Sequence, residues 1–160
     1  MHPLRPVCRG LEARSPHSSP NIQDLERAIG KDRFDIVVCS EVIEHTQDPA
    51  LSVRQLVSVL KPGGMLAISC PNRKWIFLLH LVQILGLRKH YQGFENWLWP
   101  KELLKLLETS GMTIERKVGI RLVPWHFLPK KFAIALDRAT SKWNYYWTVN
   151  LAVLAKKKIR

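Results

Sequence analysis

The chain has 160 residues, enough for one domain with a hydrophobic core, and it carries a net charge of +12. Its three cysteines lie far apart in the sequence, which argues against a disulfide scaffold and against a zinc site built on C-x-x-C. Residues 1–20 lack the apolar stretch of a signal peptide, and no segment reaches the roughly 18 apolar residues of a membrane span.

The first part of the chain offers little regular structure. Residues 1–20 contain four prolines and no sustained hydrophobic period, so we expect an irregular leader ahead of a domain at 21–160. A surface turn at Asn21 and Ile22 then leads into a short predicted helix from Leu25 to Ile29.

The stretch from 34 to 72 has the pattern of a strand-helix-strand unit. Continuous apolar runs at Ile36–Val38 and Met65–Ile68 are typical of parallel strands that are covered on both faces. Between them, Asp48 is a good N-cap and Pro49 suits the first helical position. The segment 61–64, Lys-Pro-Gly-Gly, is expected to end this helix in a glycine turn.

A second predicted helix, from Trp75 to Leu85, is apolar nearly all round. Such a helix is buried in a core, inserted in a membrane interface or packed on a lipophilic ligand. The sequence leaves these alternatives open, although Arg88 and Lys89 just beyond the helix favour the interface.

The remaining elements alternate between helix and strand. Pro100 to Gly111 predicts an amphipathic helix, and residues 112–122 predict a strand. A further helix is expected at 128–142. A last strand is expected at 147–155, where Trp147 and Val149 share the apolar side with Leu151 and Val153.

The loop after the first strand of the central unit holds the densest group of functional side chains. If the loop forms a helical turn, Glu41, Glu44 and His45 converge on one face. Two carboxylates and an imidazole could then hold a divalent cation. His45 could equally act as a general base toward a hydroxyl group.

The segments FDIVVCSEVIEH and LKPGGMLAISCPN resemble the central part of class I S-adenosylmethionine (SAM) dependent methyltransferases, of the kind that includes ubiquinone-biosynthesis O-methyltransferases. The resemblance implies an α/β, Rossmann-like sheet. Because no G-x-G pattern occurs in the sequence, the family's glycine-rich loop is missing. We therefore expect only the fourth to seventh strands of that sheet with their flanking helices, in a partial domain.

The resemblance also implies roles for individual residues. His45 and Glu41 are the implied catalytic residues, and a lid inserted at about 73–98 is implied to cover the substrate. The implied SAM contacts are Asn21, Ile22, Cys39, Ser40 and Glu41; the implied magnesium ligands are Glu41, Glu44, His45 and His90; and the implied substrate-lid residues are Trp75, Phe77, Trp97 and Trp125. Metal-free relatives carry the same acidic loop, so its residues could instead simply line the SAM pocket.

The function that we expect is SAM-dependent O-methylation of a lipophilic small molecule or lipid precursor. Two alternatives remain: a catalytically inactive methyltransferase-like fragment that acts as a binding or membrane-associated module, and an RNA 2'-O-methyltransferase. The basic charge attracts anionic partners and does not by itself choose between lipid headgroups and nucleic acid. Because no recognised nucleic-acid module is present, we expect a cytoplasmic protein whose partner is an anionic membrane surface rather than nucleic acid.

Overall fold

The computed structural model describes residues 22–86, 95–120 and 145–159. Short 3-10 turns lie at Ile22–Asp24, Ile43–His45 and Arg73–Trp75. The helices and strands are α1 (Leu25–Ile29), β1 (Phe34–Ser40), α2 (Pro49–Ser58), β2 (Leu60–Pro71), α3 (Ile76–Ile84), α4 (Pro100–Thr109), β3 (Met112–Ile120) and β4 (Asn150–Lys157).

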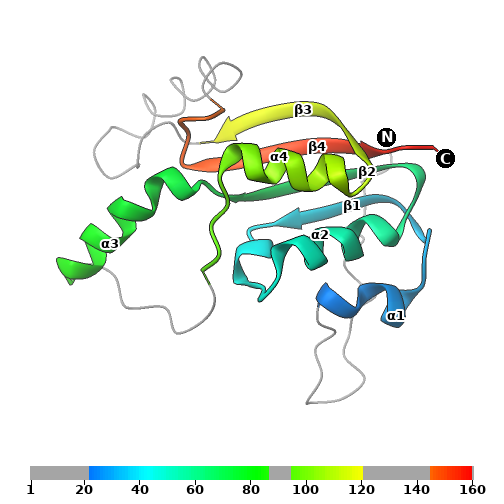
Figure 1. Ribbon diagram of the computed structural model, residues 1–160, viewed down its shortest axis with the longest axis horizontal. Coiled ribbons are helices and arrows are strands. Elements are labelled where there is room, and N and C mark those ends of the chain that lie inside the picture. Colours follow the sequence, from blue (N-terminus) through cyan, green and yellow to red (C-terminus); the bar gives the residue numbers. More distant parts are fainter. Residues whose placement is uncertain (1–21, 87–94, 121–144, 160) are drawn as a thin grey trace, which may run out of the picture.

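The described strands form one four-stranded sheet in the order β1-β2-β4-β3. β1 and β2 run parallel, and β4 runs antiparallel to both β2 and β3. The predicted α/β class is confirmed, and the carboxyl ends of β1 and β2 meet at one end of the sheet (Figure 1).

Helices α2 and α4 lie on the same face of this sheet (Figure 1). Their apolar residues form one core with alternate residues of the strands: Val53, Leu56, Leu103 and Leu107 pack with Leu66, Ile68, Leu151 and Val153. The opposite face of β1 carries Ile36 and Val38, which are 64% and 71% exposed. The prediction that both faces of this strand are covered is therefore wrong, because both crossover helices pack on one side.

The start of α2 follows the predicted capping chemistry. The Asp48 carboxylate accepts a hydrogen bond of 2.9 Å from the amide of Leu51, and Pro49 occupies the first helical position. These two residues fix where the chain enters the helix.

The residues expected to form a glycine turn after α2 belong to β2 instead. Phe34 pairs with Leu60 and Ile36 pairs with Met65, so the segment 61–64 is accommodated as an irregularity in the ladder. Gly63 has φ of 78°, which a residue with a side chain rarely adopts. The helix ends just before this segment, as expected, but no separate turn follows it.

The last strand begins three residues later than its alternation indicated. Leu151, Val153 and Ala155 are buried as predicted, whereas Trp147 is 65% exposed. The hydroxyl of Thr148 lies 3.1 Å from the carbonyl oxygens of Tyr145 and Asn150, which holds this segment in a turn. Trp147 therefore lies outside the sheet.

The apolar helix exists as α3, and part of its surface is bare. Phe77, Leu81, Ile84 and Leu85 are between 49% and 82% exposed. The alternative of ordinary core packing is wrong for these four side chains. The predicted leader, the predicted helix at 128–142 and the end of the strand at 121–122 lie outside the described residues.

Candidate functional site

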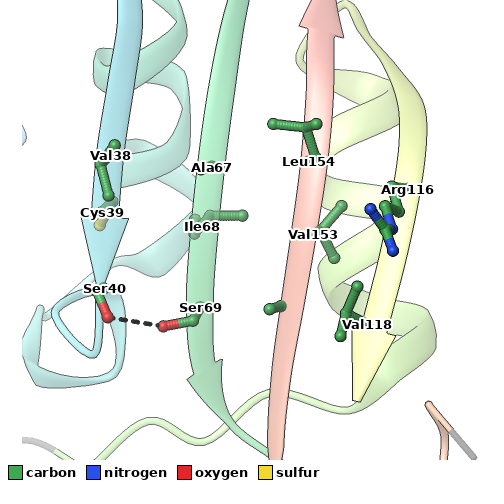
Figure 2. A pocket seen from close by; sticks show the side chains of 11 residues that line it. Val38, Cys39, Ser40, Ala67, Ile68, Ser69, Arg116, Val118, Val153 and Leu154 are labelled. Carbon is green, nitrogen blue, oxygen red and sulfur yellow. Dashed lines mark hydrogen bonds between the residues drawn. The ribbon is translucent and has the colours of Figure 1, made fainter. Parts of the chain in front are cut away.

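The carboxyl ends of β1 and β2 are joined by their last side chains. Ser40 pairs with Ser69 in the parallel register, and their hydroxyl oxygens lie 3.0 Å apart (Figure 2). In open α/β sheets, ligands bind beyond the carboxyl ends of the strands. The two serines therefore mark the edge at which a ligand would be expected.

Glu41 follows directly and turns the chain out of β1. Its φ of 53° lies in the left-handed region, which is uncommon for a residue with a side chain. The Glu41 amide donates to the Ser69 carbonyl oxygen at 3.0 Å. Its carboxylate accepts hydrogen bonds from the Ser69 hydroxyl at 2.9 Å and from the Asn150 amide at 3.1 Å. Glu41 thus connects the ends of three strands, β1, β2 and β4.

Glu44 is the buried member of the loop, with 2% of its surface exposed. One carboxylate oxygen, Oε1, lies 3.8 Å from Nε2 of His45. The other carboxylate oxygen of Glu44, Oε2, is buried with no hydrogen-bond partner among the described residues. Burial is the main cause that raises the pKa of this carboxyl, and the nearby Glu41 raises it further; its own backbone amide and His45 oppose the shift.

His45 ends the 3-10 turn Ile43–His45, and 41% of its side chain is exposed. The turn is held from the segment that leads into α4. Asn96 donates its backbone amide to the Glu44 carbonyl and its side-chain amide to the Thr46 carbonyl, each at 2.7 Å. The imidazole is thus presented to solvent on an anchored turn.

The three residues do not share one helical face: Glu44 and His45 lie close together, and Glu41 lies apart from that turn. The 3-10 turn begins at Ile43, so Glu41 stays at the end of the strand, while Glu44 points into the core. Within the described ranges, no group of three or more His, Cys, Asp or Glu side chains could hold a metal ion. The implied ligand His90 lies outside these ranges. The predicted magnesium site therefore has no support from the structure, and we derive no step through a metal.

The two cysteines of the central unit are buried in the strands. Burial raises the pKa of the Cys39 thiol to about 11, and it raises that of Cys70 still further. Since the thiolate is the nucleophile, both side chains behave as small apolar groups and are unsuited to covalent chemistry.

The other implied contacts are only partly described. Ile22 packs against the core, and Asn21 lies outside the described residues. Among the implied lid residues, the rings of Trp75 and Phe77 stack with centroids 6.2 Å apart. Trp97 lines a separate hollow of about 290 Å³, and Trp125 is not described. The structure leaves the lid role as a prediction.

The uncovered face of the sheet forms a shallow hollow of about 250 Å³ (Figure 2). Val38, Ala67 and Leu154 give it an apolar floor, Arg116 lies on one side, and the Ser40 and Ser69 hydroxyls close one end. The edge therefore combines hydroxyl groups and one carboxylate with an apolar sheet face.

The comparisons with known proteins identify the family. A family model described as a methyltransferase domain matches residues 6–117. The ubiquinone biosynthesis O-methyltransferase of Coxiella burnetii is 32% identical to this chain over 124 residues. That of Nitrobacter winogradskyi is 36% identical to it over 100 residues. These matches cover 72% and 59% of this chain, and 50% and 38% of the relatives.

Solved methyltransferase structures share the fold. One, a possible histamine N-methyltransferase from Thermotoga maritima, aligns with a TM-score of 0.57 at 18% identity, covering 80% of this chain and 58% of that chain. A SAM-dependent methyltransferase from Mesorhizobium loti aligns with a TM-score of 0.53 at 15% identity, covering 89% of this chain and 72% of that chain.

The fold and the matched sequence define the class. The chain belongs to the methyltransferase domain family, among the class I SAM-dependent methyltransferases. It spans about half the length of the Coxiella burnetii relatives that it matches.

Three residues at this edge were not identified as functional from the sequence. Ser69 and Asn150 hold Glu41, and the fully buried Asn72 donates its side-chain amide to the Thr148 carbonyl at 2.9 Å. Ser69 and Asn72 lie within the segment that carried the family resemblance, so that resemblance could have indicated a role for them. Nothing near Asn150 in the sequence indicates its role.

Proposed function

We propose that this chain takes part in SAM-dependent O-methylation of a lipophilic small molecule; its similarity to ubiquinone biosynthesis O-methyltransferases supports O-methylation as the reaction. The observation that carries the proposal is the joined end of β1 and β2, where Ser40, Glu41 and Ser69 form a polar edge beside an apolar sheet face. The cofactor would lie against this edge, contacting the end of β1 and the loop that follows.

The cofactor supplies a methyl group that its sulfonium has already activated, so the protein mainly orients the acceptor and excludes water. His45 is the proposed base: its imidazole accepts the proton of the acceptor hydroxyl. The carboxylate of Glu44, 3.8 Å from Nε2, would stabilise the imidazolium that forms. Glu41, tied to Ser69 and Asn150, would position the loop that carries His45.

The test is transfer of a radiolabelled methyl group from SAM to a phenol with a hydrocarbon tail, catalysed by the purified chain. Removing a general base typically costs on the order of 10²- to 10⁴-fold in rate, so His45→Gln should show a loss of this size. The control is Glu108→Gln, because Glu108 is exposed near the end of α4 and lies outside the implied lid. Equal activity of the two variants would reject His45 as the base.

A second function is favoured by the uncovered sheet. No described strand pairs with the outer edge of β1, and Ile36 and Val38 are exposed beside it. Such an edge favours association with another polypeptide. The chain would then act as a binding module without catalysis. Absence of methyl transfer by the purified chain would reject catalysis by this chain and favour the module.

A further inference from the structure

Aromatic rings and basic side chains gather around the start of α3. Trp75 donates its indole N–H to the Trp147 carbonyl at 3.1 Å, which joins the start of α3 to the turn before β4. The Lys74 ammonium lies 3.8 Å from the centroid of the Trp147 ring, and the Arg73 guanidinium lies 6.0 Å from that of Trp99. The rings are held in place by these contacts and remain open to solvent, with Trp147 65% and Trp99 45% exposed.

The exposed residues of α3, with Leu85 directly after it, extend this surface with apolar side chains. Phe77, Leu81, Ile84 and Leu85 follow the spacing i, i+4, i+7 and i+8, which places them on one face of a helix. Ile84 is 82% exposed and Phe77 63%. Contiguous exposed apolar surface of this kind marks an interaction site more often than a chance arrangement.

The charge at the start of α3 is positive. Lys74, which directly precedes the helix, lines a hollow of about 710 Å³ together with Lys101, Lys105, Trp99 and Tyr146. Glu102 is the one acidic residue in this lining, and its carboxylate accepts a hydrogen bond from the Trp99 amide at 3.1 Å. The partner of this surface should therefore be negatively charged as well as apolar.

We propose that this surface, the exposed face of α3 with its rim of tryptophans and lysines, docks on an anionic membrane. Amphipathic helices lie in the interface with their apolar side at the boundary between headgroups and acyl chains, and tryptophan rings favour the headgroup level. Each lysine or arginine near the surface adds attraction to anionic lipid. In the part of the chain that the structure describes, no helix is long and apolar enough to cross a membrane, so the contact is peripheral.

The docking surface lies at the same end of the molecule as the carboxyl ends of β1 and β2 (Figure 1). A lipophilic acceptor in the bilayer would therefore be close to the proposed site. The docking itself does not depend on methyl transfer and can be tested in a chain without activity.

Single-stranded nucleic acid is the main competing partner, because bases stack on aromatic side chains and phosphates attract lysine. The aliphatic residues of α3 argue for the bilayer, since Leu81, Ile84 and Leu85 offer no stacking surface. The two partners therefore differ in their dependence on α3.

The experiment is sedimentation of the full chain with vesicles of phosphatidylcholine alone or mixed with phosphatidylglycerol. We expect binding to the mixed vesicles, weakening as salt is raised. Ile84→Ser removes an exposed apolar group, and the double variant Lys101→Glu, Lys105→Glu reverses the rim charge. Each should reduce binding by on the order of tenfold.

Matched controls lie at the other end of β4. Ile159→Ser and Lys158→Glu replace exposed residues of the same types and should leave binding unchanged. Equal binding to neutral and mixed vesicles, or equal losses in the variants and the controls, would overturn the proposal. So would tight binding of single-stranded RNA that Ile84→Ser leaves intact, or self-association through α3 without vesicle binding.

Discussion

At the scale of single residues, Glu44 determines a pH dependence of stability. Its pKa is raised in the folded chain, so the folded state keeps the proton at pH values where the unfolded chain has lost it. The stability associated with this proton is fully present below the unfolded pKa and is lost as pH rises through the folded pKa. The free energy of unfolding should therefore fall as the pH rises from the unfolded pKa of Glu44 through its folded pKa.

Glu44→Gln should remove this pH dependence, because the amide does not titrate. Urea denaturation at a series of pH values from about 4.5, the ordinary glutamate value, upward measures the effect: the parent chain should lose stability relative to Glu44→Gln as the pH rises. The control is Glu108→Gln on the exposed side of α4. A parent chain and Glu44→Gln variant with parallel pH profiles would contradict the assignment.

Gly119 in β3 is a second residue with a specific packing role. A Cβ atom at this position would overlap the side chain of Thr148. It would lie 3.0 Å from the Cβ of Thr148 and still closer to its Oγ1 and Cγ2 atoms. Thr148 is 1% exposed and cannot move outward. Gly119→Ala should therefore cost about 1–3 kcal/mol of stability, measured by thermal or urea unfolding.

The cause can be separated from a general loss of backbone freedom by a double-mutant cycle. Thr148→Ala removes the atoms that a new methyl group would meet. The combination Gly119→Ala, Thr148→Ala should be less destabilising than the sum of the two single changes. Strict additivity would show that the cost of Gly119→Ala has another origin.

At the scale of elements, the N-terminus of α2 depends on one side chain. The Asp48 carboxylate satisfies the amide of Leu51, which has no partner within the helix. Asp48→Ala should lower the free energy of unfolding by about 1 kcal/mol. Asp48→Asn should retain most of the stability that the cap provides, because asparagine is an equally good cap. Equal losses in both variants would assign the effect to charge.

The elements also show what can be predicted from the sequence. The start of α2 was predictable because capping depends on neighbouring residues such as Asp48 and Pro49. The start of β4 was not, since Thr148 holds the preceding turn through its contacts with Tyr145 and Asn150. The candidate site divides in the same way: Glu41 and His45 stood out in the sequence, whereas Asn150, 109 residues from Glu41, could be placed only by the fold.

The open face of the sheet was also beyond the sequence pattern. An apolar run such as Ile36–Val38 indicates a strand with two apolar faces, but it does not say whether a helix covers each face. In the structure, α2 and α4 share one face, and the residues on the other face of β1 are exposed. Patterning of single strands therefore gives the class of the fold but not its layers.

At the scale of the whole molecule, the edge formed by Ser40, Glu41 and Ser69 adjoins the open face of the sheet, because both serines line the hollow there. The proposed docking surface around α3 lies at the same end of the molecule (Figure 1). This arrangement would bring a cofactor, a lipophilic acceptor and a membrane to one end of the molecule. The position of the cofactor is the central claim, because the proposed chemistry depends on it.

The most direct test is a nuclear magnetic resonance titration of the 15N-labelled chain with SAM up to millimolar concentration, with methionine as the control ligand. Weak binding remains measurable in this experiment. We predict saturable shifts of the backbone amides at residues 39–45 and 69–72, at the carboxyl ends of β1 and β2. No shifts at millimolar SAM, or shifts confined to other parts of the chain, would contradict the proposed position of the cofactor.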